Sequence, residues 1–156
     1  MLVRDLMTAD VRCASPDATL SEIAAQMKRL NVGAIPICNS EGQLIGIITD
    51  RDITVECVAA GLNPQEYRAR EFMTAEPITI SPDAPIGEAL RIMGHEQVHR
   101  LPVVEDGHLV GILSASDLAV KFSDNHAIAD LFYQISQPVR SATTHVHPIS
   151  TTTVYP

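Results

Sequence analysis

The sequence has few of the features that a nucleic acid or a membrane requires. It contains no tryptophan and 4% aromatic residues, and its 11 lysines and arginines face 19 aspartates and glutamates, for a formal net charge of −8. Nucleic-acid binding depends on clustered cations and on aromatic side chains that stack with bases. Membrane spans need runs of roughly 18 apolar residues, and none is present. We therefore expect neither a nucleic-acid nor a membrane partner.

Cysteine is also scarce, and a secretory signal is missing. The first residues lack a basic segment followed by an apolar stretch, so the cytoplasm is the expected location. The three cysteines cannot all pair within the chain, and in a reducing compartment they are expected to be thiols. The 156 residues, 46% apolar and 19% charged, are typical of one globular domain or two small ones.

The most informative feature of the sequence is an internal repeat. A single shift aligns its two halves, and the register moves by one residue only in a turn, where length changes are tolerated. The matching segments are Met7–Ala9 with Met73–Ala75, Ser15–Ala18 with Ser81–Ala84, Pro36 with Pro102, Gly46–Thr49 with Gly111–Ser114, and Asp52 with Asp117. We predict repeat 1 with its linker over residues 1–66, repeat 2 over 67–122, and a C-terminal helix and extended tail over 123–156.

Each repeat reads as β-α-β-β-α. The pattern predicts short strands at 11–13 and 78–80, helices from Thr19 and Pro85, hairpins at 34–49 and 101–114, and closing helices at 50–60 and 115–122. A strand-helix-strand crossover makes the first strand parallel to the second. One such unit has too little core to stand alone. We therefore expect an α/β (α+β) fold in which the two repeats pack with pseudo-twofold symmetry.

These motifs together resemble the CBS (cystathionine-beta-synthase) domain, and the tandem resembles a CBS pair, or Bateman module. The shared features are Met-Thr at the start, Ser-Pro-Asp before the helix, apolar-Pro-apolar in the hairpin, and Gly-x-x-Thr/Ser-x-x-Asp at its end. The likeness covers about residues 2–122 and extends to small stand-alone bacterial CBS-pair proteins. It implies a regulatory, non-enzymatic module that binds AMP, ADP, ATP, S-adenosylmethionine or NAD between its repeats. It also implies a homodimer and a separate, unidentified effector protein.

The hydroxyl–carboxylate pairs Thr49/Asp52 and Ser114/Asp117 are the expected ribose contacts, because a carboxylate can accept hydrogen bonds from both ribose hydroxyls. The simpler alternative is that they cap the following helices. The segment from Val98 to Val104 is similar to nucleotide-sensing repeats of the AMP-activated protein kinase gamma subunit, which implies phosphate contacts for His99 and Arg100. Repeat 1 lacks this cation, and Arg51 could compensate, so we expect two unequal clefts.

The adenine slot is expected, by family position, to use Arg12 and a set of small or apolar residues: Val11, Cys13, Ala34, Ile35, Thr79, Ile80 and Val98. The large apolar members are equally suitable as core residues. Cys13 and Cys38 end neighbouring strands and could pair within the chain, pair across a dimer or bind a metal. We expect reduced thiols, and we expect Cys57 in the core.

Metal binding is a minority interpretation of the six histidines. His145 and His147 would share one face of a strand, with His126 as a third ligand, whereas a closed zinc site takes four. An enzyme is disfavoured because no nucleophile–base pair, phosphate loop or metal motif is present. We therefore expect no cofactor, and an adenine nucleotide or S-adenosylmethionine as regulatory ligand. The remaining alternative is a redox-responsive or structural interaction protein that binds no nucleotide.

Overall fold

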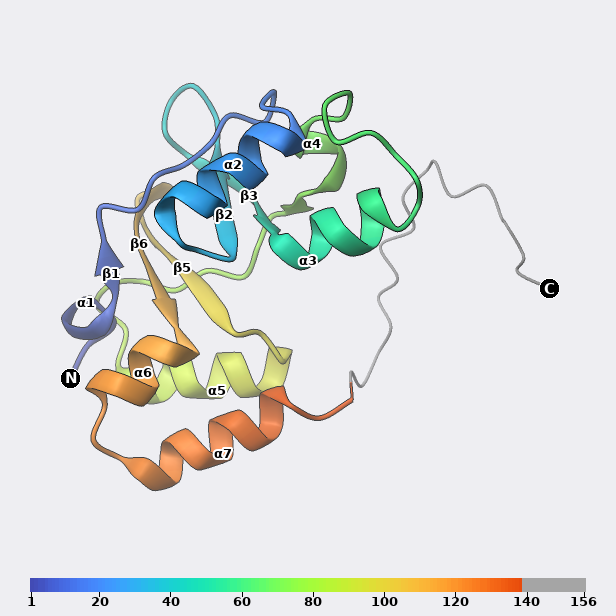
Figure 1. Cartoon of the computed structure of the whole chain (residues 1–156). Coiled ribbons are helices and arrows are strands. Elements are labelled where there is room, and N and C mark those ends of the chain that lie inside the picture. Colours follow the sequence, from blue (N-terminus) through green and yellow to red (C-terminus); the bar gives the residue numbers. More distant parts are fainter. Residues whose placement is uncertain (139–156) are drawn as a thin grey trace.

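The computed structural model describes residues 1–138 and has mixed helix and strand structure (Figure 1). The predicted tail beyond residue 138, with His145 and His147, lies outside the described residues. The elements in chain order are α1 (Val3–Leu6), β1 (Thr8–Ala9), α2 (Leu20–Leu30), β2 (Ala34–Cys38), β3 (Leu44–Thr49), α3 (Asp50–Asp52), the π-helix η1 (Ile53–Val58), α4 (Ala69–Phe72), β4 (Thr74–Ala75), α5 (Ile86–Glu96), β5 (Arg100–Glu105), β6 (His108–Ser114), α6 (Ala115–Lys121) and α7 (Asn125–Ile135).

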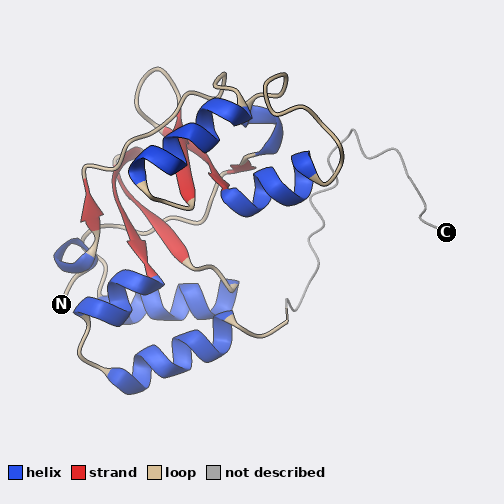
Figure 2. Ribbon diagram, viewed as in Figure 1, coloured by secondary structure: helices blue, strands red, loops and turns tan. Residues whose placement is uncertain are grey.

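The strands form two three-stranded sheets, in the orders β2-β3-β4 and β1-β6-β5. Helices α2 and η1 cover one sheet and α5 and α6 the other, with the strands between these helical layers (Figure 2). Helix α7 packs against α5 and α6 on the side away from the strands. The predicted fold class, two packed β-α-β-β-α repeats followed by a helix, is confirmed. Both hairpins were predicted to within a residue or two, because alternating and continuous apolar runs define them.

The predicted first strands of each repeat are corrected by the structure. Residues 11–13 and 78–80 form no extended ladder, and only isolated parallel bridges remain, Ala14 to Ile37 and Ile80 to Val103. The third strand of each sheet is instead an antiparallel pair of residues, β1 or β4. A two-residue strand has no periodic pattern, so nothing in the sequence marks it.

The two sheets also exchange segments between the repeats. Strand β1 lies at the start of repeat 1 but pairs with β6, and β4 lies at the start of repeat 2 but pairs with β3. The short helices follow the same exchange: Val3 and Leu6 lie in the core of repeat 2, and Ala69 and Phe72 lie in the core of repeat 1. The predicted boundary at residue 66 separates the two copies of the sequence repeat. It does not separate the two hydrophobic cores, because each core contains residues from both sides of residue 66.

Helix ends account for much of the agreement between sequence and structure. Thr19 caps α2 and forms the predicted capping box with Glu22. The predicted helix at 50–60 is one turn of α-helix followed by η1, which turns Ile53 and Cys57 into the core. Gly61 follows with a φ of +74°, as its predicted capping role requires. Within the described residues no helix is long and apolar enough to span a membrane.

Candidate functional site

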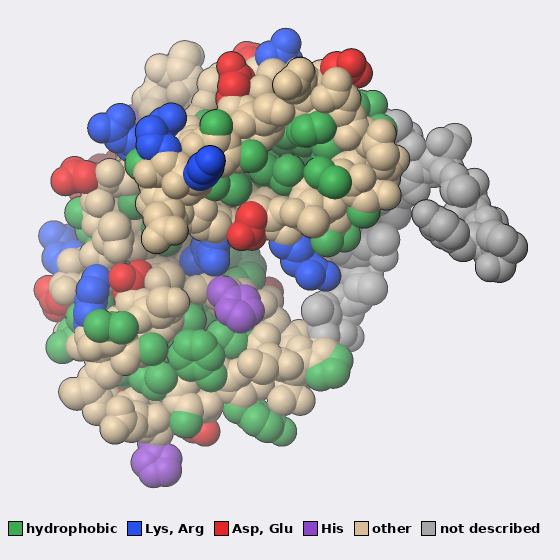
Figure 3. All heavy atoms as spheres, in the orientation of Figure 1, with side chains coloured by type: hydrophobic (Ala, Val, Ile, Leu, Met, Phe, Trp, Pro, Cys, Tyr) green, Lys and Arg blue, Asp and Glu red, His purple; other side chains and the backbone are tan. Residues whose placement is uncertain are grey.

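Two clefts lie where the repeats meet, and each draws residues from both of them. We name them cleft 1, of about 500 Å³, and cleft 2, of about 410 Å³. Basic, acidic and histidine side chains gather along the seam between the two halves of the molecule (Figure 3). This mixture of charge beside apolar strand residues suits a ligand with an apolar ring and polar or anionic groups.

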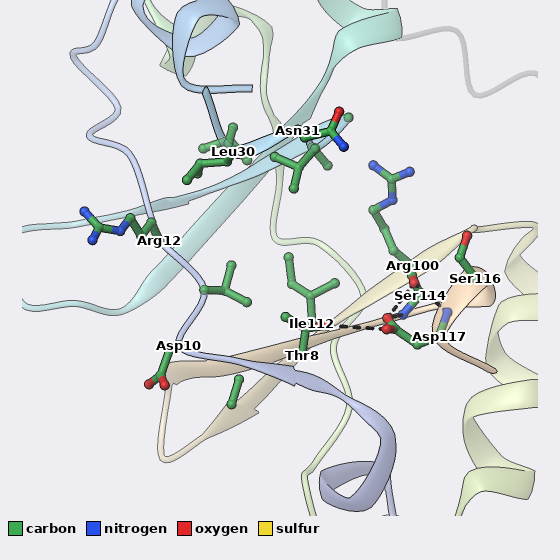
Figure 4. Close-up of a pocket in the computed structure, with 16 residues that line it drawn as sticks. Thr8, Asp10, Arg12, Leu30, Asn31, Arg100, Ile112, Ser114, Ser116 and Asp117 are labelled. Atoms are coloured by element: carbon green, nitrogen blue, oxygen red, sulfur yellow. Dashed lines mark hydrogen bonds between the residues drawn. The ribbon is translucent and has the colours of Figure 1, made fainter. Parts of the chain in front are cut away.

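Cleft 1 is lined by three stretches of chain (Figure 4). The first runs from β1 to Arg12, the second joins the end of α2 to the start of β2, and the third is the end of β6 with the first turn of α6. Arg100, at the start of β5, completes the lining. Of the predicted residues, cleft 1 brings together Val11, Arg12, Ala34, Ile35, Arg100, Ser114 and Asp117.

Cleft 2 is the pseudo-symmetric counterpart, built from the end of β3, the segment after β4 and the start of β5. It brings together the predicted residues Thr49, Arg51, Asp52, Val98, His99 and Arg100. The remaining predicted residues, Cys13, Thr79 and Ile80, line neither cleft. Ile80 is 5% exposed and belongs to the core, in line with the alternative reading of the large apolar candidates.

The hydroxyl–carboxylate pairs act as helix caps in both repeats. Thr49 Oγ1 accepts from the Asp52 N–H at 3.2 Å, and the Asp52 carboxylate accepts from the Thr49 N–H at 2.8 Å. Ser114 and Asp117 form the same reciprocal pair, both at 3.0 Å. The structure therefore confirms that these residues cap the helices that follow them. It leaves ribose contact possible, because the capped carboxylates still line the clefts.

The two aspartates differ in what surrounds their carboxylates. Asp117 also accepts hydrogen bonds from Lys121 Nζ at 3.1 Å and from Thr8 Oγ1 at 3.4 Å. Burial alone would raise the pKa of Asp117, but hydrogen bonds from Ser114 and Lys121, with the lysine charge, hold it below the ordinary value. Asp52 Oδ1 makes no hydrogen bond with any described residue, so one oxygen of this carboxylate is available to a ligand.

Arg100 is the cation that the two clefts share. It begins β5, is half-buried, and borders both clefts. Within residues 1–138 its guanidinium makes no hydrogen bond or ion pair, and the same holds for Arg12 and Arg51. The sequence placed Arg100 in only one cleft. It also missed Asn31 and Ser116, and it missed Asp10 and Glu76, which directly follow the exchanged strands β1 and β4.

The cysteine prediction is wrong for two of the three residues. Cys13 and Cys38 form a disulfide within the chain, with their Cα atoms 5.7 Å apart. The parallel bridge between Ala14 and Ile37 brings them together, so they pair because of the backbone geometry. Cys57 is a buried free thiol, as predicted, and burial raises its pKa.

Across residues 1–138 no group of three or more histidines, cysteines or acidic residues is placed to hold a metal ion. His126 is exposed on α7, apart from both clefts. The other two histidines of the minority metal interpretation, His145 and His147, lie outside the described residues.

This arrangement, two repeats with a ligand-sized cleft on each side of their junction, defines a module of two tandem repeats. The CBS domain family model matches residues 3–58 and again 69–124, and the chain belongs to this family. The resemblance inferred from the sequence motifs is thereby confirmed.

Relatives of similar size share most of the chain. It is 37% identical over 139 residues to hypoxic response protein 1 of Mycobacterium tuberculosis, covering 89% of this chain and 96% of that protein. It is 38% identical over 134 residues to the CBS domain-containing protein YhcV of Bacillus subtilis, covering 86% and 94%.

Solved structures extend the comparison to ligands. The crystal structure of hypoxic response protein I with two coordinated zinc ions superposes with a TM-score of 0.72 at 36% identity, covering 79% of this chain and all of that one. The CBS domain pair of protein MJ0100, in complex with 5′-methylthioadenosine and S-adenosyl-L-methionine, gives a TM-score of 0.72 at 28% identity, covering 79% of this chain and 100% of that one.

Proposed function

We propose that the chain is a regulatory module that binds adenosine-containing ligands in clefts 1 and 2 and acts through a separate effector protein. The observation that carries this proposal is Arg100, a half-buried cation without a protein partner among the described residues, in a chain of net charge −8. In so acidic a protein an unpaired cation that borders two clefts suits an anionic ligand group. The adenosine ligands of the MJ0100 pair support the same class of ligand.

In cleft 1, we infer that adenine lies against Val11 and Ala34, and ribose reaches the Asp117 carboxylate. Ile35 is fully buried and belongs to the core of repeat 1. Phosphate or another anionic group then meets Arg100 or Arg12. A planar guanidinium can donate two parallel hydrogen bonds to one phosphate.

Cleft 2 offers a different balance of charge. Asp52 has a carboxylate oxygen free for ribose, Arg51 and Arg100 supply two cations, and His99 adds a ring nitrogen that can hydrogen-bond a ligand. Asp50 and Glu76 also line cleft 2 and offset its two arginines, so we propose that the two clefts are unequal in their charged lining.

We further propose a homodimer in the cytoplasm that involves neither a membrane nor a nucleic acid and carries no catalysis of its own. The mycobacterial protein is described with two coordinated zinc ions. We do not include zinc in the proposal, because the described residues of this chain contain no cluster of three or more potential metal ligands. The second candidate is a redox-responsive interaction protein that binds no nucleotide, and the Cys13–Cys38 disulfide is the observation that favours it.

The test is a thermal-shift panel of AMP, ADP, ATP with magnesium, S-adenosylmethionine and NADH. A ligand at about 100 times its Kd stabilises the folded state by about 2.7 kcal/mol, or roughly 5–10 °C for a chain of this size. We expect such a shift with at least one ligand, and its loss in the double variant Asp52→Asn/Asp117→Asn. An unshifted melting temperature with all five would contradict the proposal and favour the redox-responsive alternative.

Arg100→Ala serves as the matched control for the phosphate contact. A hydrogen bond to a charged group contributes about 1.5–3 kcal/mol, so AMP should bind this variant about ten-fold or more weakly. Adenosine, which lacks the phosphate, should bind wild type and variant alike. Equal losses for both ligands would show that Arg100 supports the fold of the cleft and does not contact phosphate.

A further inference from the structure

The disulfide lies at one end of the segment that borders cleft 1. We call residues 10–13 the strap. It leaves β1, which belongs to the sheet of repeat 2, and ends at Ala14, which bridges to Ile37 in the sheet of repeat 1. Val11 and Arg12 line cleft 1, and Cys13 is bonded to Cys38 at the end of β2. The strap therefore connects the two repeats along the wall of one cleft (Figure 4).

Hydrogen bonds hold the ends of the strap better than its middle. At one end Thr8 pairs with Ile112, and at the other the Ala14 N–H donates to the Pro36 carbonyl at 2.9 Å. Between them, the N–H groups of residues 11–13 donate no hydrogen bond to any described residue. The disulfide thus adds a covalent restraint where the backbone has few others.

Repeat 2 provides an internal comparison. Thr79 and Val104 stand at the positions of Cys13 and Cys38, so no crosslink is possible there. Even so, Ile80 makes the equivalent bridge, with its N–H donating to Pro102 at 3.1 Å. The fold of a repeat therefore forms without the disulfide, whose restraint is confined to cleft 1.

We propose that the Cys13–Cys38 disulfide is a redox switch that sets the affinity of cleft 1 for its adenosine ligand and leaves cleft 2 unaffected. This rests on the proposed function, since it regulates the same site. Disulfides in reducing compartments are usually transient or redox-sensing. The proposed cytoplasmic location fits a switch better than a permanent structural crosslink.

The reductant is a dithiol. One of its thiolates attacks Cys13 Sγ, which is half-buried, whereas Cys38 is 6% exposed. The S–S bond breaks, Cys38 leaves as a thiolate and takes up a proton, and Cys13 is held in a mixed disulfide. The second thiol of the reductant then attacks that mixed disulfide and releases Cys13 as a thiol. Two electrons and two protons pass from the dithiol, which becomes a disulfide, to the two cysteines.

Reduction frees the strap, so a ligand in cleft 1 must order Val11 and Arg12 as it binds. Ordering a side chain on binding costs free energy, and we expect binding to be roughly 3- to 10-fold weaker for this reason. The oxidised form is the high-affinity form, and the effect is modest because the backbone bridge at Ala14 remains.

The experiment is a calorimetric titration of AMP, with S-adenosylmethionine as a second probe, into oxidised and dithiothreitol-reduced full chain. Asp52→Asn isolates cleft 1 and Asp117→Asn isolates cleft 2. The variant Cys13→Thr/Cys38→Val, which copies the residues of repeat 2, mimics the reduced state without a reductant. Mass spectrometry of non-reduced peptides establishes which form is present, and thermal unfolding establishes that each variant is folded.

Roughly 3- to 10-fold weaker binding on reduction in the Asp52→Asn chain, with no change in the Asp117→Asn chain, is the expected result. If cleft 1 binds with equal affinity in the oxidised and reduced chain, the redox switch is overturned but the proposed function is not. The same holds if Cys13 and Cys38 are still found as thiols after treatment with an oxidant. Absence of binding by both clefts in both redox states overturns the proposed function, and the switch with it. If the double cysteine variant does not fold, the reduced wild-type chain still decides between these outcomes.

Discussion

At the scale of single residues, the two aspartates show how one motif acquires two environments. Asp117 has Lys121 four residues on, in the next helical turn, whereas Asp52 has Glu56 at the same distance. The lysine donates to Asp117, and nothing described donates to Asp52 Oδ1. Residues four apart on a helix are neighbours. Asp117 is therefore held in place by protein contacts, and Asp52 retains more capacity for a ligand.

The lowered pKa of Asp117 makes part of the folding stability depend on pH. Because its folded-state pKa lies below the unfolded value of about 3.9, ionised Asp117 stabilises the fold above that pH. The contribution is lost as the pH falls through the folded-state pKa. We expect Asp117→Asn to lower the free energy of unfolding by about 1 kcal/mol at pH 7, the size of one net hydrogen bond.

Urea unfolding of wild type and Asp117→Asn between pH 7 and pH 3 measures this effect. The difference between the two proteins should stay constant down to about pH 4 and shrink below it. A difference that is the same at pH 3 as at pH 7 would show that the carboxylate charge contributes nothing.

At the scale of elements, the two-residue strands decide how the clefts are built. Strand β1 carries the chain directly into the strap, and β4 carries it into the matching segment along cleft 2. Both strands lie against a glycine of the neighbouring strand: Ala9 pairs with Gly111, and Ala75 pairs with Gly46. Methionines pack over both glycines, so the contact has no room for a side chain.

Gly111→Ala should therefore displace β1. A Cβ at this position would lie 2.7 Å from Met7 Sδ and 2.9 Å from the Thr8 carbonyl oxygen, which is backbone and cannot rotate away. Such overpacking costs about 1–3 kcal/mol, to be measured as the free energy of unfolding in urea. Ligand binding in cleft 1 should weaken as well, because the strap moves with β1.

Gly87→Ala is the control for this substitution. Gly87 is exposed on α5 with no atom within 4 Å of an added Cβ, so alanine should stabilise the helix by up to about 1 kcal/mol. If both glycine variants were equally stable, close packing of β1 against β6 would not be what holds cleft 1 together.

At the scale of the whole molecule, the segment exchange makes the two repeats interdependent. The core of repeat 2 contains α1 from the start of repeat 1, and the core of repeat 1 contains α4 from the start of repeat 2. Each cleft likewise combines residues of both repeats. Arg100 is one residue common to the lining of both clefts. A ligand that orders Arg100 in one cleft would therefore change the lining of the other.

Sequence reasoning could predict the features that local chemistry specifies. The capping box at Thr19, the apolar hairpins and the Thr/Ser-x-x-Asp turns each carry their own signal. It could not predict β1 and β4, because two residues show no periodicity and their partners lie far along the chain. It also missed the disulfide, because the expected compartment outweighed the neighbouring positions of Cys13 and Cys38.

The most direct test of a two-cleft adenosine-binding module is a calorimetric count of sites. AMP and S-adenosylmethionine would be titrated into wild type, Asp52→Asn, Asp117→Asn and the double variant, each shown to be folded by circular dichroism. We predict two sites of unequal affinity in wild type, one in each single variant and none in the double variant. No measurable binding of either compound to wild type, or undiminished binding to the double variant, would contradict the assignment of these clefts.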